Sequence, residues 1–345
     1  MMKRRLARGA LVLGVAAAIA IPAGVILAER SGGSGEAVAA GGSGGLQTED
    51  GGPEAKLERI DVDGLPEIVF SANENGRYRL SGIDADGRGR TQVTEGRALD
   101  PAWSADGEAL AYVSEAVGLR GTQLAIVLQR AGERAERFPA GARVISNPAF
   151  RDANRISLVS TLQTSSGAAG VVGDAEIVTV DLESGTEAAL TSSHDTEYAP
   201  AWSPDGTRVA YVAGEAGCTA TSEQACPQPL VLARGSERTD LSLDGAAMHP
   251  AWSPDGERLL VSVGSPEGVR IWLVDSSDGS ATPVTEPGGA DLEPSWAPDG
   301  ERFVFVRDCD LWVQPLGDGA AENITGTPDV CELSPAWRPA GEATA

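Results

Sequence analysis

The residues best suited to bind a ligand stand immediately before six copies of a short proline–aromatic motif. The motif reads PAWSPDG or a variant of it, and the residues before its proline are Asp100, Asn147, Ala199, His249, Glu293 and Ser334. If the six copies surround one axis, these residues begin the innermost strands and ring one mouth of a central channel. Two carboxylates, an imidazole and an amide then meet there. Such a set is suited to a cation, a peptide end or a small polar ligand. The competing interpretation is a solvated channel lining with no ligand.

Further polar residues flank two of these positions and extend the candidate binding face. The ligand- or partner-binding candidates are Asp100, Asn147, His194, Asp195, Glu197, Tyr198, His249, Asp291 and Glu293. Two long loops, 161–175 and 214–228, are expected on the same face, because loops on a rigid scaffold collect binding groups. An acidic mouth formed by the carboxylates favours a basic or amine-bearing envelope protein or peptide as the partner.

Catalytic motifs are sparse. Asp100, Asn147, His249 and Glu293 have the residue types of a metal cluster, which keeps open a cation-dependent hydrolase or lyase with an axial site. The stretch GGSGG at 41–45 matches the G-x-S-x-G consensus of the hydrolase nucleophile elbow. Neither a strand before it nor a helix after it is predicted, so it is not taken as a catalytic site. No cofactor is predicted, and a non-catalytic binding protein is the favoured interpretation.

The charge balance excludes one class of partner. The chain of 345 residues contains 27 Lys and Arg against 50 Asp and Glu, a formal net charge of −23. A field of that sign repels phosphate backbones, so a nucleic-acid partner is not expected. The chain is expected to be a monomer.

The spacing of the motifs predicts an all-β fold. The aromatic residues of the motif lie 41–52 residues apart, and they are Trp103, Phe150, Trp202, Trp252, Trp296 and Trp337. A period of this length, with short alternating strands between copies, is typical of a β-propeller blade. The large rings are expected to fill the gaps between blades. The second blade has the weakest pattern, since Phe138-Pro139 replaces the Leu-Thr of the other outer strands.

The first and last fragments complement each other. Three strands precede the first motif, and one strand, PAW, follows from the last copy at 335–341. Together they predict six blades closed by a three-plus-one arrangement, which leaves no free first or last edge. The propeller is expected over residues 57–341, with a tail at 342–345.

The N-terminus has the pattern of an export signal or a membrane anchor. Lys3, Arg4, Arg5 and Arg8 precede an uncharged run from residue 10 to 28. Basic residues before an apolar run predict an N-terminus inside and a following domain outside the cytoplasm. Residues 1–30 are thus a hydrophobic helix, either a cleaved signal peptide of a secreted protein or a single-pass anchor. The Gly- and Ser-rich stretch 31–56 is expected to be a flexible linker.

Four cysteines are expected to pair in an oxidising compartment. Cys218 and Cys226 share one loop, and Cys309 and Cys331 lie in loops that are expected to approach each other. The sequence therefore predicts the bonds Cys218–Cys226 and Cys309–Cys331.

The repeated PAWSPDG followed by a strand such as LAYVS resembles the propeller of the TolB family. The same repeats occur in the propeller domains of prolyl-oligopeptidase-like enzymes. The resemblance covers about residues 65–341, and it implies a six-bladed propeller with an interaction role in the cell envelope. TolB proteins carry an α/β domain before the propeller, and the sequence departs from that pattern here.

Overall fold

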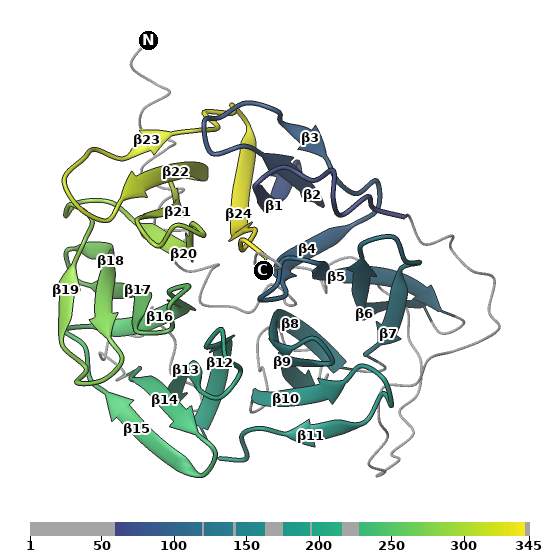
Figure 1. The fold of residues 1–345 in the computed structure, drawn as a ribbon, viewed down its shortest axis with the longest axis horizontal. Helices are drawn as coiled ribbons and strands as arrows, with labels where there is room; N and C mark the ends of the chain where they lie inside the picture. Colours follow the sequence, from purple (N-terminus) through teal and green to yellow (C-terminus); the bar gives the residue numbers. More distant parts are fainter. Residues whose placement is uncertain are drawn as a thin grey trace.

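Six four-stranded antiparallel sheets surround a central axis as the blades of a propeller (Figure 1). The computed structural model describes residues 59–118, 121–140, 143–162, 175–193, 195–215 and 228–341. These described residues contain 24 strands and no helix, which confirms the all-β, six-bladed prediction. Accordingly, no helix in this part of the chain is long and apolar enough to cross a membrane. The segment 1–30, the linker 31–56 and the tail 342–345 lie outside the described residues.

Each blade runs from an innermost strand beside the axis to a short outer strand. In the order of blades 1 to 6, the innermost strands are β24 (Val330–Trp337), β4 (Ala98–Trp103), β8 (Arg143–Asp152), β12 (Asp195–Trp202), β16 (Ala246–Trp252) and β20 (Asp291–Trp296). The second strands are β1 (Ile68–Glu74), β5 (Ala109–Gly118), β9 (Arg155–Leu162), β13 (Val209–Glu215), β17 (Arg258–Ser265) and β21 (Arg302–Arg307).

The third strands are β2 (Arg77–Ile83), β6 (Gly121–Arg130), β10 (Glu176–Asp181), β14 (Leu230–Arg234), β18 (Gly268–Asp275) and β22 (Asp310–Pro315). The outer strands are β3 (Thr91–Gln92), β7 (Glu136–Pro139), β11 (Glu187–Ala189), β15 (Glu237–Leu241), β19 (Ala281–Pro283) and β23 (Glu322–Asn323). Strand β7 shows that blade 2 does have an outer strand. It pairs with β6. Its Phe138 ring is buried, and Phe138-Pro139 stands where the other outer strands have Leu-Thr.

The hydrophobic core lies between the blades. One cluster joins Val69 of blade 1 to Leu110 and Val127 of blade 2, and another joins Leu260 of blade 5 to Phe303 of blade 6. Because both faces of each sheet pack against neighbouring blades, the sequences of the middle strands are nearly continuous runs of apolar residues. No blade completes its core alone.

The motif tryptophans join neighbouring blades through their ring nitrogens and their ring faces. Trp252 of blade 5 donates its Nε1–H to the carbonyl of Ala201 in blade 4 at 3.0 Å, and the guanidinium of Arg208 lies 4.6 Å from the ring centroid. The same arginine-over-tryptophan contact recurs for Arg151–Trp202, Arg258–Trp296, Arg302–Trp337 and Arg338–Trp103. The predicted wedges are therefore also cation–π contacts between blades.

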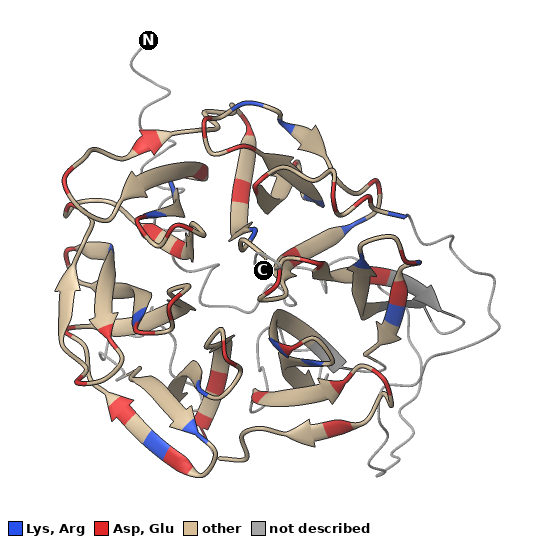
Figure 2. Ribbon diagram, viewed as in Figure 1, with Lys and Arg blue, Asp and Glu red and all other residues tan. Residues whose placement is uncertain are grey.

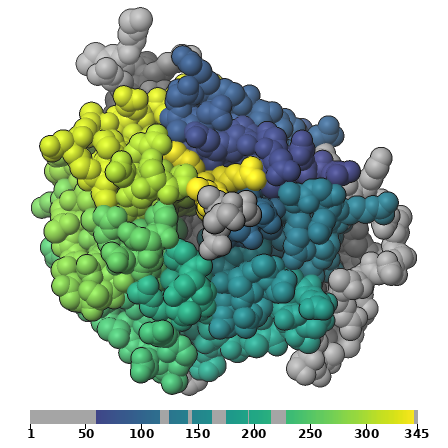
Figure 3. Space-filling model, viewed as in Figure 1, coloured from purple at the N-terminus to yellow at the C-terminus, as the bar shows by residue number. Residues whose placement is uncertain are grey.

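The ring closes through the last strand. Strand β24 pairs antiparallel with β1, and it places Trp337 opposite Ile68, as the three-plus-one arrangement predicts. Trp103 of blade 2 donates its Nε1–H to the Ala336 carbonyl at 3.2 Å. Figure 3 shows the C-terminal end, in yellow, packed against the purple N-terminal strands.

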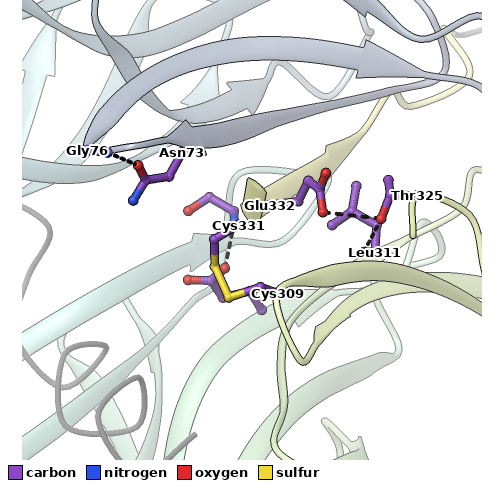
Figure 4. The surroundings of a disulfide bond; sticks show 9 residues. Asn73, Gly76, Cys309, Leu311, Thr325, Cys331 and Glu332 are labelled. Carbon is purple, nitrogen blue, oxygen red and sulfur yellow. Dashed lines mark hydrogen bonds between the residues drawn. A yellow bond between two sulfur atoms is a disulfide. The ribbon is translucent and has the colours of Figure 1, made fainter. Parts of the chain in front are cut away.

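A disulfide bond fastens this closing strand to blade 6. Cys309, in the turn between β21 and β22, is bonded to Cys331 of β24, which confirms this predicted pair (Figure 4). The Glu332 N–H also donates to the Cys309 carbonyl at 2.9 Å. The other predicted pair, Cys218–Cys226, lies outside the described residues.

Removal of residues 335–345 is expected to unfold or aggregate the protein. The deletion removes the buried Trp337 and leaves Ile68 and Val69 of β1 without their partners on the closing strand. Loss of one buried tryptophan side chain costs about 3–5 kcal/mol, against a typical total stability of about 5–15 kcal/mol. Thermal unfolding and solubility measure the effect, with deletion of 342–345 alone as the control. A soluble truncated protein with unchanged melting contradicts the closure.

Replacement of both Cys309 and Cys331 by serine is expected to lower the free energy of unfolding by about 3 kcal/mol. The bond closes a loop of 22 residues, and a loop of that length loses conformational entropy in the unfolded chain. Urea unfolding of the oxidised wild type and of the double variant gives the difference. Equal midpoints in the two proteins contradict a stabilising role for the bond.

Candidate functional site

Six residues with left-handed backbone conformation interrupt the innermost strands. They are the residues before the six motif prolines, and their φ angles lie between 47° and 53°. In blade 2, Asp100 and Pro101 stand opposite a single residue, Tyr112, of the neighbouring strand. Proline has no N–H to contribute to the ladder, so the pair forms a β-bulge. A positive φ is uncommon outside glycine, and six equivalent occurrences point to a constraint at the axis.

The bulges correct the predicted position of these residues along the strands. The sequence placed them at the start of the innermost strands, at one mouth of the channel. In the structure β4 begins at Ala98 and β8 at Arg143, so the bulge lies within the strand. Pairing with the second strand continues on both sides of it, which only the register reveals.

The six residues and their prolines line one cavity on the axis of the propeller. The axial ring, as we call it, consists of Asp100, Asn147, Ala199, His249, Glu293 and Ser334. The cavity has a volume of about 170 Å³. Pockets for whole small molecules are usually about 300–1,000 Å³, so this one is suited to a single side chain or a chain end.

One half of the axial ring is joined by hydrogen bonds that cross blades. Glu293 accepts the Ser334 N–H at 2.6 Å, and the Ser334 hydroxyl donates to Asp100 at 3.1 Å. Asp100 then accepts the Asn147 N–H at 3.2 Å through its other oxygen. These bonds run from blade 6 through blades 1 and 2 to blade 3, across the closing strand.

The other half of the ring has an unsatisfied imidazole. His249 lines the cavity, and its Nδ1 atom is buried with no hydrogen-bond partner in the described part of the chain. Burial lowers the pKa of His249 to about 4, although the charge of Asp100 opposes the shift. Burial likewise raises the pKa of both Asp100 and Glu293. The cavity therefore offers carboxyl oxygens and a neutral imidazole to a ligand that donates hydrogen bonds.

The structure brings four predicted site residues together and separates others from them. Asp100, Asn147, His249 and Glu293 meet in the axial ring, as their position before the prolines suggested. Asp195, which is half-buried, does not line the cavity. His194 lies outside the described residues, as do most of the two long loops.

Three other candidates do not line the cavity, so the predicted acidic mouth is smaller than expected. Asp291 is fully buried and forms a two-bonded ion pair with Arg307, at 2.6 and 2.8 Å. The Tyr198 hydroxyl donates to Gln228 at 2.7 Å, and burial raises the pKa of this phenol. Glu197 is fully buried and also lies outside the cavity lining. Sequence alternation alone did not show which way these side chains point.

Two serines that the candidate set omitted hold the ring in place. Ser334 joins Glu293 to Asp100, and its position before the sixth proline was the signal available in the sequence. Ser71 of β1 accepts the Asp100 N–H at 3.1 Å, and nothing in the sequence marks it.

The described residues contain no group of three or more His, Cys, Asp and Glu side chains arranged to hold a metal ion. Asp100, His249 and Glu293 line one cavity but do not form such a group. Asp and Glu residues occur along the ribbons of all six blades (Figure 2).

Replacement of His249 by glutamine is expected to make the free energy of unfolding depend less on pH on the acid side of neutrality. Between its unfolded pKa near 6.5 and its folded pKa of about 4, the unfolded chain binds more protons at this site than the folded chain. The wild type therefore loses stability as pH falls through this window, on the order of 3 kcal/mol from this group. Urea unfolding at pH 7 and pH 4.5 tests it. Identical pH slopes in the two proteins contradict a buried neutral imidazole.

A family model and two sequence relatives match parts of this chain. A family model for the N-terminal region of dipeptidyl peptidase IV matches residues 253–334. The chain is similar to a TolB homologue of Chlorobium chlorochromatii, with 30% identity over 148 residues that cover 42% of this chain and 31% of the relative. A TolB homologue of Chlorobium luteolum is 26% identical over 174 residues, which cover 50% of this chain and 35% of the relative. The matches span about a third of each relative's length.

Solved structures share the propeller. TolB from Acinetobacter baumannii superimposes with a TM-score of 0.61 at 19% identity, over 79% of this chain and 66% of that one. An oligogalacturonate lyase in complex with manganese gives a TM-score of 0.50 at 18% identity, over 78% of this chain and 76% of the lyase. At such identities the likeness establishes the fold alone. Together with the sequence relatives, it shows that the described part of this chain is a β-propeller similar to that of TolB and its homologues.

Proposed function

We propose that the chain is a non-catalytic module that binds a protein or peptide outside the cytoplasm, in the cell envelope. The observation that carries the proposal is the axial cavity, which is lined by two carboxyl groups and by an imidazole whose Nδ1 has no hydrogen-bond partner among the described residues. The TolB homologues support a protein-binding role, and the basic N-terminal segment followed by an apolar run supports export or anchoring.

The chemistry of the cavity favours an amine-bearing or basic segment of the partner. Asp100 and Glu293 each have one carboxyl group on the cavity, and the pKa of each is raised because burial disfavours the charged form. An ammonium group placed between them stabilises the charged form of both carboxyl groups. Binding is then expected to strengthen as pH rises and to weaken as salt screens the charges.

A cation-dependent hydrolase or lyase with an axial site remains the second candidate. The similarity to an oligogalacturonate lyase in complex with manganese is the reason to retain this candidate, but that similarity is one of fold. The absence of a metal-binding group among the described side chains gives this candidate less support than the binding module.

Replacement of His249 by alanine together with Glu293 by glutamine is expected to lower partner capture at least about tenfold, a loss of about 1.4 kcal/mol in binding. Glutamine keeps an oxygen for the Ser334 N–H and removes the charge. The experiment quantifies proteins captured from envelope extract by the full-length chain in detergent, at low and high salt. The control replaces the exposed residues Glu108 and Glu257 by glutamine. Equal capture by both double variants excludes the axial cavity as the binding site.

A further inference from the structure

A short segment before the first strand fills the groove between blades 1 and 2. Residues 59–66 lead toward β1, and Pro66 lies on Gly82 of β2, 2.8 Å from the place that a Cβ atom would take there. The Ile60 N–H donates to the Gln129 side chain of blade 2 at 3.3 Å. The apolar side chains of the segment pack with the cluster that the two blades share, and they are Ile60, Val62 and Leu65. This groove therefore holds a stretch of the chain itself.

The corresponding groove between blades 6 and 1 is open. Counted through the strand pairs from the motif tryptophan, Val313 of β22 corresponds to Gly82 of β2. Val313 lines a cavity of about 830 Å³ between blades 6 and 1, which are neighbours in Figure 1. That volume lies within the usual range of ligand pockets, about 300–1,000 Å³. The cavity has room for several side chains of a partner.

Two substitutions explain why this groove stays open. Between blades 4 and 5, Arg208 crosses the join and donates to the Ser276 hydroxyl at 3.0 Å. Arg302 stands at the same place in blade 6, six residues after the motif tryptophan, but it binds Asp299 of its own turn at 2.9 and 2.8 Å. Blade 1 has Ala85 where blade 5 has Ser276, and alanine offers no oxygen to an arginine from the neighbouring blade.

The walls of the groove carry an excess of negative charge. Its acidic lining residues are Glu67, Asp84, Asp86 and Glu322. Arg302 is the only cation of the lining, and it is already paired with Asp299. The carboxylates of Asp84 and Glu322 form no hydrogen bond or ion pair with other described residues. Apolar lining between the charges is supplied by Val313, Pro315 and Ala320.

We infer that the groove between blades 6 and 1 binds a short basic segment of a partner protein, as the groove between blades 1 and 2 holds residues 59–66. The carboxylates favour lysine or arginine side chains, and the apolar lining favours aliphatic side chains between them. The inference goes beyond the axial site, because the groove and the axial cavity share no lining residue. Each site can therefore be altered with the other intact.

The test titrates the full-length chain, in detergent, with a blocked pentapeptide in which three lysines alternate with two valines. Its neutral counterpart carries acetylated lysines at the same places. The wild type is expected to bind the charged peptide at least about tenfold more tightly, and the preference should shrink as salt rises. Equal binding of the two peptides, or binding of neither, overturns the inference.

A pair of charge-matched variants locates the site. Asp84→Asn combined with Glu322→Gln should abolish the preference for the charged peptide. Glu108→Gln combined with Glu257→Gln removes the same charge from exposed positions outside the groove and should retain the preference. A groove variant that still prefers the charged peptide shows that these carboxylates do not bind it, and the inference is then wrong.

Two further variants separate this groove from the axial cavity. Ala320→Trp fills the groove without changing a charge and should weaken binding of the charged peptide, whereas Ala153→Trp adds the same ring at an exposed turn and should not. His249→Ala combined with Glu293→Gln alters the axial cavity alone and should leave the preference in place. A preference that is lost there and kept in both groove variants assigns the peptide to the axial cavity. That outcome overturns the inference and leaves the proposed axial function standing.

Discussion

Closure of the ring is the constraint on which the rest of this propeller depends. Each blade buries its two faces against its neighbours, so the core is complete only when blade 6 meets blade 1. The pairing of β24 with β1 makes that join, and the bond between Cys309 and Cys331 fastens it covalently. The hydrogen bonds of the axial ring cross the same join, because Ser334 of β24 links Glu293 to Asp100. Stability and the geometry of the candidate site thus share one element.

The proline bulges connect the fold to the chemistry at the axis. A regular innermost strand would use its backbone groups in the ladder and alternate its side chains between the two faces of the blade. The left-handed residue and the proline interrupt that alternation in every blade, and they place one side chain per blade on the cavity. Side-chain identity at that position is then free to vary from aspartate to alanine without changing the backbone.

Electrostatics divides the acidic residues into two groups. One group lies on turns, where Asp205, Asp255 and Asp275 accept local hydrogen bonds that lower their pKa. A few are buried near the axis, and there each requires a partner. Asp291 and Glu332 have arginines, Asp100 and Glu293 accept backbone N–H groups, and Glu197 accepts hydrogen bonds from the hydroxyls of Ser193 and Thr191.

The sequence by itself determined the repeat, the blade count and the closure. Six proline–aromatic motifs at a spacing of 41–52 residues require six equivalent units, and a missing strand at one end matched an extra strand at the other. It also placed Asp100, Asn147, His249 and Glu293 at equivalent positions, and it paired Cys309 with Cys331. These features are periodic or follow from connectivity, so they can be read from spacing.

Only the tertiary structure decided how individual side chains are satisfied. The bulge within each innermost strand depends on register with its neighbour, and the arginine–tryptophan contacts join residues about 50 positions apart in sequence. Asp291 and Glu197 look alike in the sequence, yet one is paired and the other is not. Arg307 lies opposite Asp291 on the adjacent strand, whereas alanines lie opposite Glu197 and Glu332, and the arginine of Glu332 is Arg90, which precedes β3. These relations exist only once the strands are paired.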